Sequence, residues 1–187
     1  MKKRKKRWFF LLETACLLML TTVGIYATTQ AKLSVKNVIT VGNIEIELRE
    51  QDKKGRDVSN KDVAVSRGYT VDRIVFAENT GEQPAFVRIA VNSIYLDGET
   101  GKEAETDKIE ILFNEDARWI YEDGWFYYAE ILEPGEKTVP LLSGAYFSTT
   151  LDESNQDDVL QLKIFMHGLQ AKNNQEDVRK AVGWPEE

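Results

Sequence analysis

The chain has 187 residues, of which 42% are hydrophobic and 29% charged, a balance typical of a folded globular protein that excludes wholesale disorder. Six of the 24 Lys and Arg residues and one of the 31 acidic residues lie in the first 31 positions, which leaves 18 basic and 30 acidic residues, a net charge of −12, in the remainder. So acidic a domain disfavours binding to nucleic acid or anionic lipid through bulk electrostatics.

The N-terminus has the order of a secretory signal. Residues 2–7 are a basic block, residues 8–26 are mostly apolar, and residues 27–31 are small, as at a cleavage site. We therefore expect residues 1–31 to form a signal peptide, cut by signal peptidase after Ala27 or Ala31, and residues 32–187 to form one exported domain. The alternative is an uncut membrane anchor, because residues 8–27 are about long enough to span a bilayer. Glu13 within that segment would make such a span costly.

Cys16 is the only cysteine of the chain, and it lies within the predicted signal. A lipoprotein signal is rejected, because Glu13 occupies the position before the cysteine where a Leu-like residue is needed. The exported domain therefore contains no cysteine and must rely on its hydrophobic core for stability. Export from a bacterium is the natural inference, since small disulfide-free secreted domains are less expected in an animal secretory route.

The remainder of the chain predicts β-strands separated by turns, with almost no helix. In the first strand, Ile44, Ile46 and Leu48 share one face, and Gly42 marks a bulge or bend. Near the C-terminus, Asn174 is placed to cap a short helix. The expected strands span residues 38–48, 69–77, 85–96, 109–113, 119–121, 125–128, 138–142, 145–150 and 160–166. This pattern predicts an all-β, antiparallel β-sandwich of the jelly-roll type, following an N-terminal signal helix.

An aromatic hairpin at residues 119–128 is the strongest local signal. The Asp123-Gly124 pair provides the positive φ angles of a tight turn. Trp125 and Tyr127 then point to one face, and Phe126 and Tyr128 to the other, so we expect both faces to be covered. A core hairpin is the main interpretation. The alternative is an exposed sugar-binding platform built on Trp119 and Trp125.

The sequence offers no recognisable catalytic set. His167 is the only histidine, so a pair of zinc-binding histidines is impossible, and no Gly-x-Ser-x-Gly motif accompanies it. We therefore expect His167 to be structural, the protein not to be an enzyme, and no catalytic, cofactor-binding or metal-binding residue. The acidic loop at residues 152–158 lacks the Gly and terminal Glu of an EF-hand, which favours a solvated loop over a loose calcium site.

Three groups of motifs occur in a characteristic order. The signal is followed by NVITVGNIEIEL at residues 37–48, then by VFAENTG at 75–81 and AFVRIAV at 85–91, and then by DGWFYY at 123–128 and LEPGEKT at 132–138, with GLQA at 168–171 and AVGW at 181–184 completing the set. This order resembles the camelysin and TasA family of exported bacterial proteins, which carry a SipW-type signal peptide. The chain departs from the family just after the signal, where KLSVK at residues 32–36 replaces the usual Tyr-Phe-Thr/Ser-Asp segment.

The resemblance implies a jelly-roll sandwich and a role in the extracellular or biofilm matrix. We therefore expect a secreted, non-enzymatic structural protein of the bacterial cell surface that forms fibres or associates with them. Self-association, or association with related matrix subunits, would use strand exchange by the segment that begins at Lys32, with Ile44, Ile46 and Leu48 filling pockets. Pairing of this segment within its own domain is the alternative. A metal-dependent peptidase, as some family members are labelled, and a glycan-binding module are the alternative functions.

Overall fold

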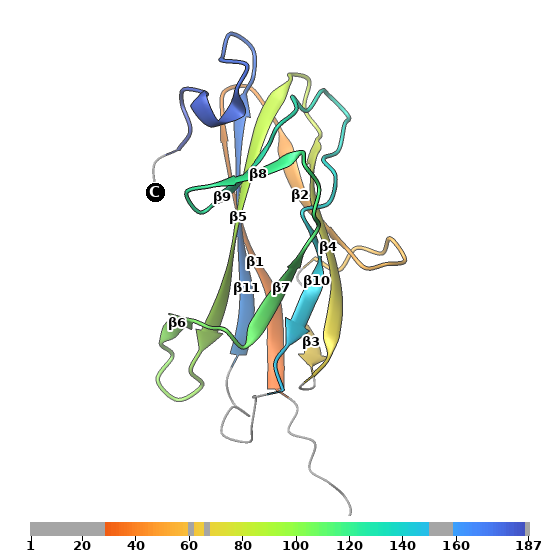
Figure 1. The fold of residues 1–187 in the computed structure, drawn as a ribbon, viewed down its shortest axis with the longest axis vertical. Helices are drawn as coiled ribbons and strands as arrows, with labels where there is room; N and C mark the ends of the chain where they lie inside the picture. Colours follow the sequence, from red (N-terminus) through yellow and green to blue (C-terminus); the bar gives the residue numbers. More distant parts are fainter. Residues whose placement is uncertain (1–28, 60–61, 66–67, 150–158, 186–187) are drawn as a thin grey trace, which may run out of the picture.

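The computed structural model describes residues 29–59, 62–65, 68–149 and 159–185 (Figure 1). Within these ranges the chain forms eleven β-strands and one short 3-10 turn, Val178–Lys180, and no α-helix. The strands make two sheets that pack face to face, so the prediction of an all-β sandwich is confirmed. The predicted signal helix lies outside the described residues.

The larger sheet has seven strands. Its order is β3 (Asp62–Val65), β1 (Thr29–Val41), β11 (Val159–Gln170), β5 (Ala85–Leu96), β9 (Trp125–Tyr128) and β8 (Trp119–Glu122), and β6 (Glu103–Glu105) also pairs with β5. The strands pair antiparallel except for β1, which runs parallel to β11. The first and last strands of the described chain therefore lie side by side.

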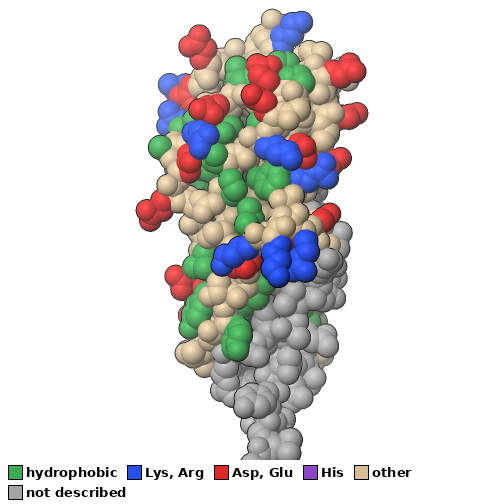
Figure 2. All heavy atoms as spheres, turned by 90° about the vertical axis from the view of Figure 1, so that its right-hand side faces the viewer, with side chains coloured by type: hydrophobic (Ala, Val, Ile, Leu, Met, Phe, Trp, Pro, Cys, Tyr) green, Lys and Arg blue, Asp and Glu red, His purple; other side chains and the backbone are tan. Residues whose placement is uncertain are grey.

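The smaller sheet has four antiparallel strands. Its order is β2 (Ile46–Gln51), β4 (Thr70–Asn79), β10 (Leu142–Phe147) and β7 (Ile109–Phe113). A bulge interrupts β10 between Leu142 and Gly144, in its pairing with both neighbours. On the face shown in Figure 2, acidic and basic side chains are interspersed. Some of the oppositely charged side chains form ion pairs, such as Arg49 of β2 with Glu78 of β4.

The core lies between the sheets and follows the alternation read from the sequence. On β5, Val87 and Ile89 point inward and are fully buried. Ile44, Ile46 and Leu48 are also buried, as predicted. The central cluster consists of Ile44, Ile46, Leu48, Val75, Ala77, Ala85, Val87, Ile89, Trp119, Tyr128, Leu132, Leu141, Leu142, Ile164 and Met166. These side chains come from both sheets, which is what holds the sandwich together.

The prediction of the aromatic hairpin is confirmed. β8 and β9 are joined by Asp123 and Gly124, whose φ angles of 49° and 83° are both positive. Tyr128 packs into the central cluster, whereas Trp125 and Tyr127 pack on the opposite face of the sheet. A strand with aromatic side chains on both faces is thus covered on both, and Trp125 and Tyr127 are core residues as predicted.

The predicted single strand at residues 38–48 is wrong. The chain bends at Gly42, whose φ is 95°, so that β1 belongs to the larger sheet and β2 to the smaller one. A Cβ atom at Gly42 would also lie only 2.8 Å from Oε1 of Gln170. The predicted bend at Gly42 is therefore confirmed, and it is sharp enough to send the chain from one sheet to the other.

Other boundaries differ from the expected ones. The segment expected as a strand at residues 138–142 joins β10 only at Leu142, and β3 and β6 lie outside the expected strands. At the C-terminus, the expected helix is a single 3-10 turn, Val178–Lys180, preceded by Asp177 rather than capped by Asn174. The predicted strands at residues 85–96 and 109–113 match β5 and β7 at both ends.

Candidate functional site

His167 lies on the outer face of the larger sheet and is buried. Its Nδ1 accepts hydrogen bonds from Nε and Nη2 of Arg88, at 3.2 and 3.0 Å, and its ring centroid lies 4.4 Å from that of Trp125. A nucleophile or a metal would need the lone pair that Arg88 occupies. Among the described residues, no group of three or more His, Cys, Asp or Glu side chains is placed to hold a metal ion. The acidic loop at residues 152–158 lies outside them.

Arg88 is the centre of this cluster and is the residue that sequence reasoning missed. Its guanidinium lies 4.1 Å from the ring centroid of Trp125 and 4.9 Å from that of Trp184. Besides His167, it donates to the hydroxyl of Tyr127 at 3.2 Å and to the carbonyl oxygen of Pro185 at 2.8 Å. The alternation of β5 places Arg88 on the outer face of the larger sheet, and that face is covered.

The cover is the segment 171–185, here called the C-terminal strap, which follows β11 and lies beside β9 (Figure 1). Val178 and Ala181 of the strap are buried against the sheet, together with Phe86 and Leu169. Asn174 closes the strap on itself, since its side chain both donates to and accepts from the main chain of Val182, at 3.0 and 2.9 Å. The strap thus turns the outer face into a second small core.

Charged groups fix the strap turn. Hydrogen bonds from the Arg179 side chain hold the pKa of Asp177 at about 2, well below its ordinary value. The same contact raises the pKa of Arg179, and this guanidinium also reaches Glu122 of β8 at 3.3 Å. The strap is therefore tied both to the sheet through Arg88 and to the aromatic hairpin through Glu122.

The aromatic side chains divide into buried and exposed sets. Trp119 and Trp125, the predicted sugar platform, are buried, so their faces are not open to a ligand. An aromatic row lies nearby instead, with Tyr121 and Phe113 exposed and Phe126 partly buried between them. The ring centroid of Phe126 lies 4.7 Å from those of both Tyr121 and Phe113. Tyr121 is 63% exposed. The row lies where β8 and β9 of the larger sheet meet the end of β7 in the smaller one.

The N-terminal strand has a distinctive environment. β1 lies between β3 and β11, and its residues from Gln30 to Val41 are in register with Val159 to Leu169, with one irregularity between Lys32 and Val35. Val38 and Ile39, on opposite faces of the strand, are each 40% exposed. β2, by contrast, places Ile46 and Leu48 in the central core. Of the described side chains of β1, Val38 and Ile39 are exposed, whereas Val41 packs against the cluster on the outer face.

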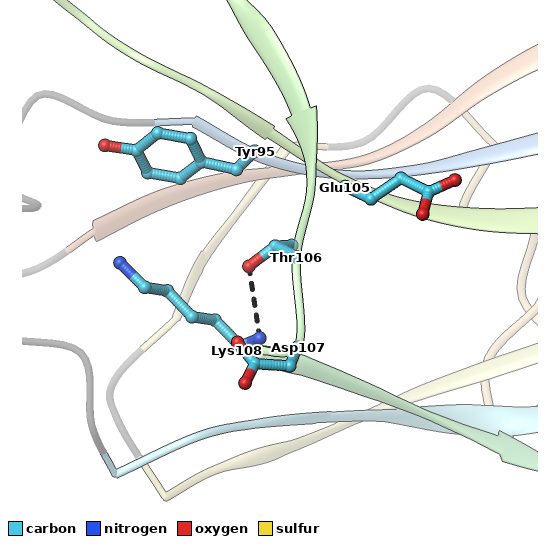
Figure 3. A pocket seen from close by; sticks show the side chains of 5 residues that line it. All are labelled: Tyr95, Glu105, Thr106, Asp107 and Lys108. Carbon is cyan, nitrogen blue, oxygen red and sulfur yellow. Dashed lines mark hydrogen bonds between the residues drawn. The ribbon is translucent and has the colours of Figure 1, made fainter.

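An open pocket, drawn in Figure 3, lies beside β6 at the end of the sandwich opposite the strap (Figure 1). It is lined by Tyr95, Glu105, Thr106, Asp107 and Lys108. The Lys108 ammonium lies 5.0 Å from the Tyr95 ring centroid, whereas the Glu105 side chain points the other way. The side chains therefore do not converge on one point, as those of a specific small-molecule site do.

The fold and this geometry define an all-β sandwich with a covered outer face and an N-terminal strand that is exposed at Val38 and Ile39. No protein-family model matches the chain, and no curated protein or solved structure shows significant similarity to it. Within the described residues, no helix is both long and apolar enough to cross a membrane. The basic and apolar segment at residues 2–26 lies outside those residues.

Proposed function

We propose that the chain is a secreted, non-enzymatic structural protein of the bacterial cell surface or biofilm matrix, related to the camelysin and TasA family. Its subunits would associate with one another, or with related matrix subunits, by exchanging β1. The observation that carries this proposal is the environment of β1, whose Val38 and Ile39 side chains, on opposite faces of the strand, are each 40% exposed. Main-chain pairing of this kind is what a strand donated by another chain supplies.

Strand exchange would keep the strand order of the larger sheet, because a β1 strand from another subunit would occupy the same position. If β1 leaves, β11 and β3 both present unpaired main-chain groups, and the vacated place accepts a strand of the same sequence. The central core would keep Ile46 and Leu48, because these side chains belong to β2, which stays in place. The predicted signal would hold β1 until export, so that association follows cleavage.

A disulfide test distinguishes exchange from pairing within one chain. Val38 and Met166 are register partners across β1 and β11. Chains carrying Val38→Cys and chains carrying Met166→Cys, all with Cys16→Ser, are unfolded, mixed, refolded and oxidised. Exchange predicts covalent dimers between the two kinds of chain. The control pair combines Val38→Cys with Ala145→Cys in the smaller sheet, which should not cross-link. Mixed disulfides no more frequent than in this control would exclude exchange.

Assembly itself is tested with matched changes in β1. Val38→Pro with Ile39→Pro removes main-chain donors on both sides of the strand, whereas Val38→Ser with Ile39→Ser keeps them. The Ser pair should form fibres or oligomers and the Pro pair should not. Deletion of residues 32–38 should also abolish assembly. Fibres that form as readily after this deletion would rule out the donated strand.

A polysaccharide-binding role is the second candidate, favoured by the aromatic row in which Tyr121 and Phe113 are exposed on either side of Phe126. Exposed aromatic faces stack on sugar rings. Tyr121→Ala should then abolish retention of the protein on insoluble matrix polysaccharide, while Tyr69→Ala, which removes an exposed aromatic ring elsewhere, should not. Equal retention of the two variants would remove this candidate.

A further inference from the structure

The aromatic row formed by Tyr121, Phe126 and Phe113 lies in an acidic part of the chain. We propose that this row binds a polymer of amino sugars whose amino groups are free and positively charged. The sugar faces lie on the exposed rings, and the ammonium groups lie beside neighbouring carboxylates. This inference rests on the polysaccharide-binding role, for which it names the ligand class, and it does not depend on strand exchange by β1.

The row is held in place by the fold. Phe126 packs against the central core, and Tyr121 is its register partner across β8 and β9. Phe113 ends β7, where it is in register with Leu142 of β10. The two exposed rings are therefore positioned before any ligand binds, so that little conformational freedom is lost on binding.

The row is not a flat platform. The ring of Tyr121 is tilted by 48° from that of Phe126, and the ring of Phe113 by 30°. Tyr121 is 63% exposed and Phe113 39% exposed, so each offers part of one face to a ligand. Tilted rings suit a single polysaccharide chain, whose sugars can turn relative to one another, better than the flat surface of a crystalline polymer.

The charge around the row is negative. Five of the residues from 113 to 131 are acidic and one is basic, a net charge of −4. Each exposed ring is followed two residues later by an exposed carboxylate, Asp123 after Tyr121 and Glu115 after Phe113. Because they are so close in sequence, these carboxylates lie near the rings.

The basic groups nearby are already paired. Arg118, the one basic residue of this stretch, lies 2.9 Å from Asp116. Arg179 of the strap is engaged by Asp177 at 2.9 Å and by Glu122 at 3.3 Å. Within the described part of the chain, the ion pairs of these two arginines thus leave the carboxylates of Glu115 and Asp123 without a cation.

This combination selects among polysaccharides. Any pyranose can stack its apolar face on an exposed aromatic ring. A polymer of uronic acids or phosphodiesters is repelled by the carboxylates, and a neutral glucan gains only the stacking. An amino-sugar polymer gains both, since its ammonium groups are attracted to the carboxylates and to the faces of aromatic rings.

Two matched oligosaccharides separate charge from stacking. The full chain, in a non-ionic detergent, is titrated calorimetrically with a six-residue oligomer of β-1,4-linked glucosamine and with its fully N-acetylated form. At about pH 5.5 the free amines are protonated and exposed carboxylates are ionised. Acetylation removes the charge and keeps the sugar ring. Hexalysine serves as a cation that has no sugar ring to stack.

The expected result is tighter binding of the glucosamine oligomer than of its acetylated form. Tyr121→Ala should weaken the binding of both oligosaccharides about 3- to 10-fold and leave that of hexalysine unchanged. Tyr69→Ala removes a ring that is 65% exposed elsewhere and should have no effect. Since Tyr121 is mostly exposed, its variant should fold.

A pair of charge variants tests the carboxylates. Glu115→Gln with Asp123→Asn should weaken the binding of the glucosamine oligomer alone, and Asn tolerates the positive φ of the turn. Glu99→Gln with Asp107→Asn changes the net charge equally at exposed positions away from the row and should have no effect. Equal losses in the two pairs would overturn the proposal, because bulk charge would then explain the binding.

The remaining outcomes separate this proposal from the polysaccharide-binding role itself. Binding of both oligosaccharides that depends on Tyr121 but is equally tight would support polysaccharide binding and overturn the preference for amino sugars. Binding of the glucosamine oligomer that survives Tyr121→Ala unchanged would overturn the row as its site. Binding of neither oligosaccharide would remove both.

Discussion

Nη1 of Arg73 lies 3.1 Å from Oε2 of Glu50, and the two side chains are only 1% and 0% exposed. Glu50 is on β2 and Arg73 on β4, so the pair lies within the smaller sheet. Burial lowers the pKa of Arg73, and the charge of Glu50 opposes this shift. An ion pair inside a sandwich costs desolvation energy that the attraction between the charges only partly offsets.

Breaking this pair should destabilise the protein more than removing it. Glu50→Leu removes the carboxylate that pairs with the buried guanidinium and should lower the free energy of unfolding by about 3–5 kcal/mol. Glu50→Leu combined with Arg73→Met should recover most of this loss. Urea denaturation followed by tryptophan fluorescence measures both values. A double variant no more stable than Glu50→Leu would contradict the expectation.

The bulge in β10 makes a second prediction. A Cβ atom at Gly144 would lie 2.6 Å from the carbonyl oxygen of Val71, which the strand pairing holds in place. At Gly168 the nearest atoms, 3.0 Å away, belong to the side chains of Ile44 and Ile46, which can adjust. Gly144→Ala should therefore cost about 2–3 kcal/mol and Gly168→Ala about 1 kcal/mol. The opposite order in thermal or urea unfolding would show that β4 can shift at the bulge.

Local signals in the sequence were sufficient to predict the aromatic hairpin and the bounds of β5 and β7. Asp123-Gly124 requires positive φ angles, and the alternation of β5 defines its inner face without reference to the rest of the chain. β1 was missed before Val38 for the opposite reason. Its neighbour is β11, more than 120 residues away, and parallel pairing leaves no local mark.

The candidate site was predicted only in part. The sequence indicates that His167 is structural, but not that Arg88 would bond to it, because the two residues become cross-strand partners only through the register of β5 and β11. A signal was nevertheless present. Phe86 and Ala90, which share the outer face with Arg88, are apolar, and an apolar outer face implies a cover. The strap that provides it contains too few apolar residues to be predicted as a core element.

The two faces of the aromatic hairpin give a third prediction. Trp125 is 6% exposed and packs against His167 and Arg88, whereas Tyr121 covers only Phe126. Trp125→Ala should lower the free energy of unfolding by about 3–5 kcal/mol, and Tyr121→Ala by less than about 1 kcal/mol. Urea titrations of the two variants provide the comparison. A Trp125→Ala variant as stable as the wild type would show that the packing of Trp125 against His167 and Arg88 does not stabilise the fold.

The strap turn has an acid dependence of its own. The pKa of Asp177 is lowered from 3.8 to about 2, so its ionised form stabilises the folded turn above pH 3.8, and this contribution is lost as the pH falls through 2. Asp177→Asn keeps an oxygen for the main-chain NH of Arg179 but removes the charge. At pH 7, amides 178–182 should exchange faster in Asp177→Asn than in the wild type, and the difference should shrink towards pH 2. A difference independent of pH would assign the effect to geometry instead.

The position of signal cleavage has a structural consequence. β1 begins at Thr29, and Thr29, Gln30, Ala31 and Lys32 pair with β3. Cleavage after Ala31 would remove three of these four partners, whereas cleavage after Ala27 would keep all of them. Within the described residues β3 pairs with β1 alone, so its place in the sheet depends on this choice.

We therefore predict that the mature protein begins at Thr28. Mass spectrometry of the secreted protein gives the terminus, and detection of Trp8 in it would contradict export with cleavage. Two chains made to begin at Thr28 and at Lys32 then test the physical reason. Amides of Asp62–Val65 should be protected from hydrogen exchange in the longer chain and should lose most of this protection in the shorter one, because their main-chain partners are absent. Amides of β5, which pairs with β11, β9 and β6, serve as the internal control and should be equally protected in both chains. Equal protection of β3 in both chains would mean that Lys32 alone holds β3 in place, and the preference for cleavage after Ala27 would lose its basis.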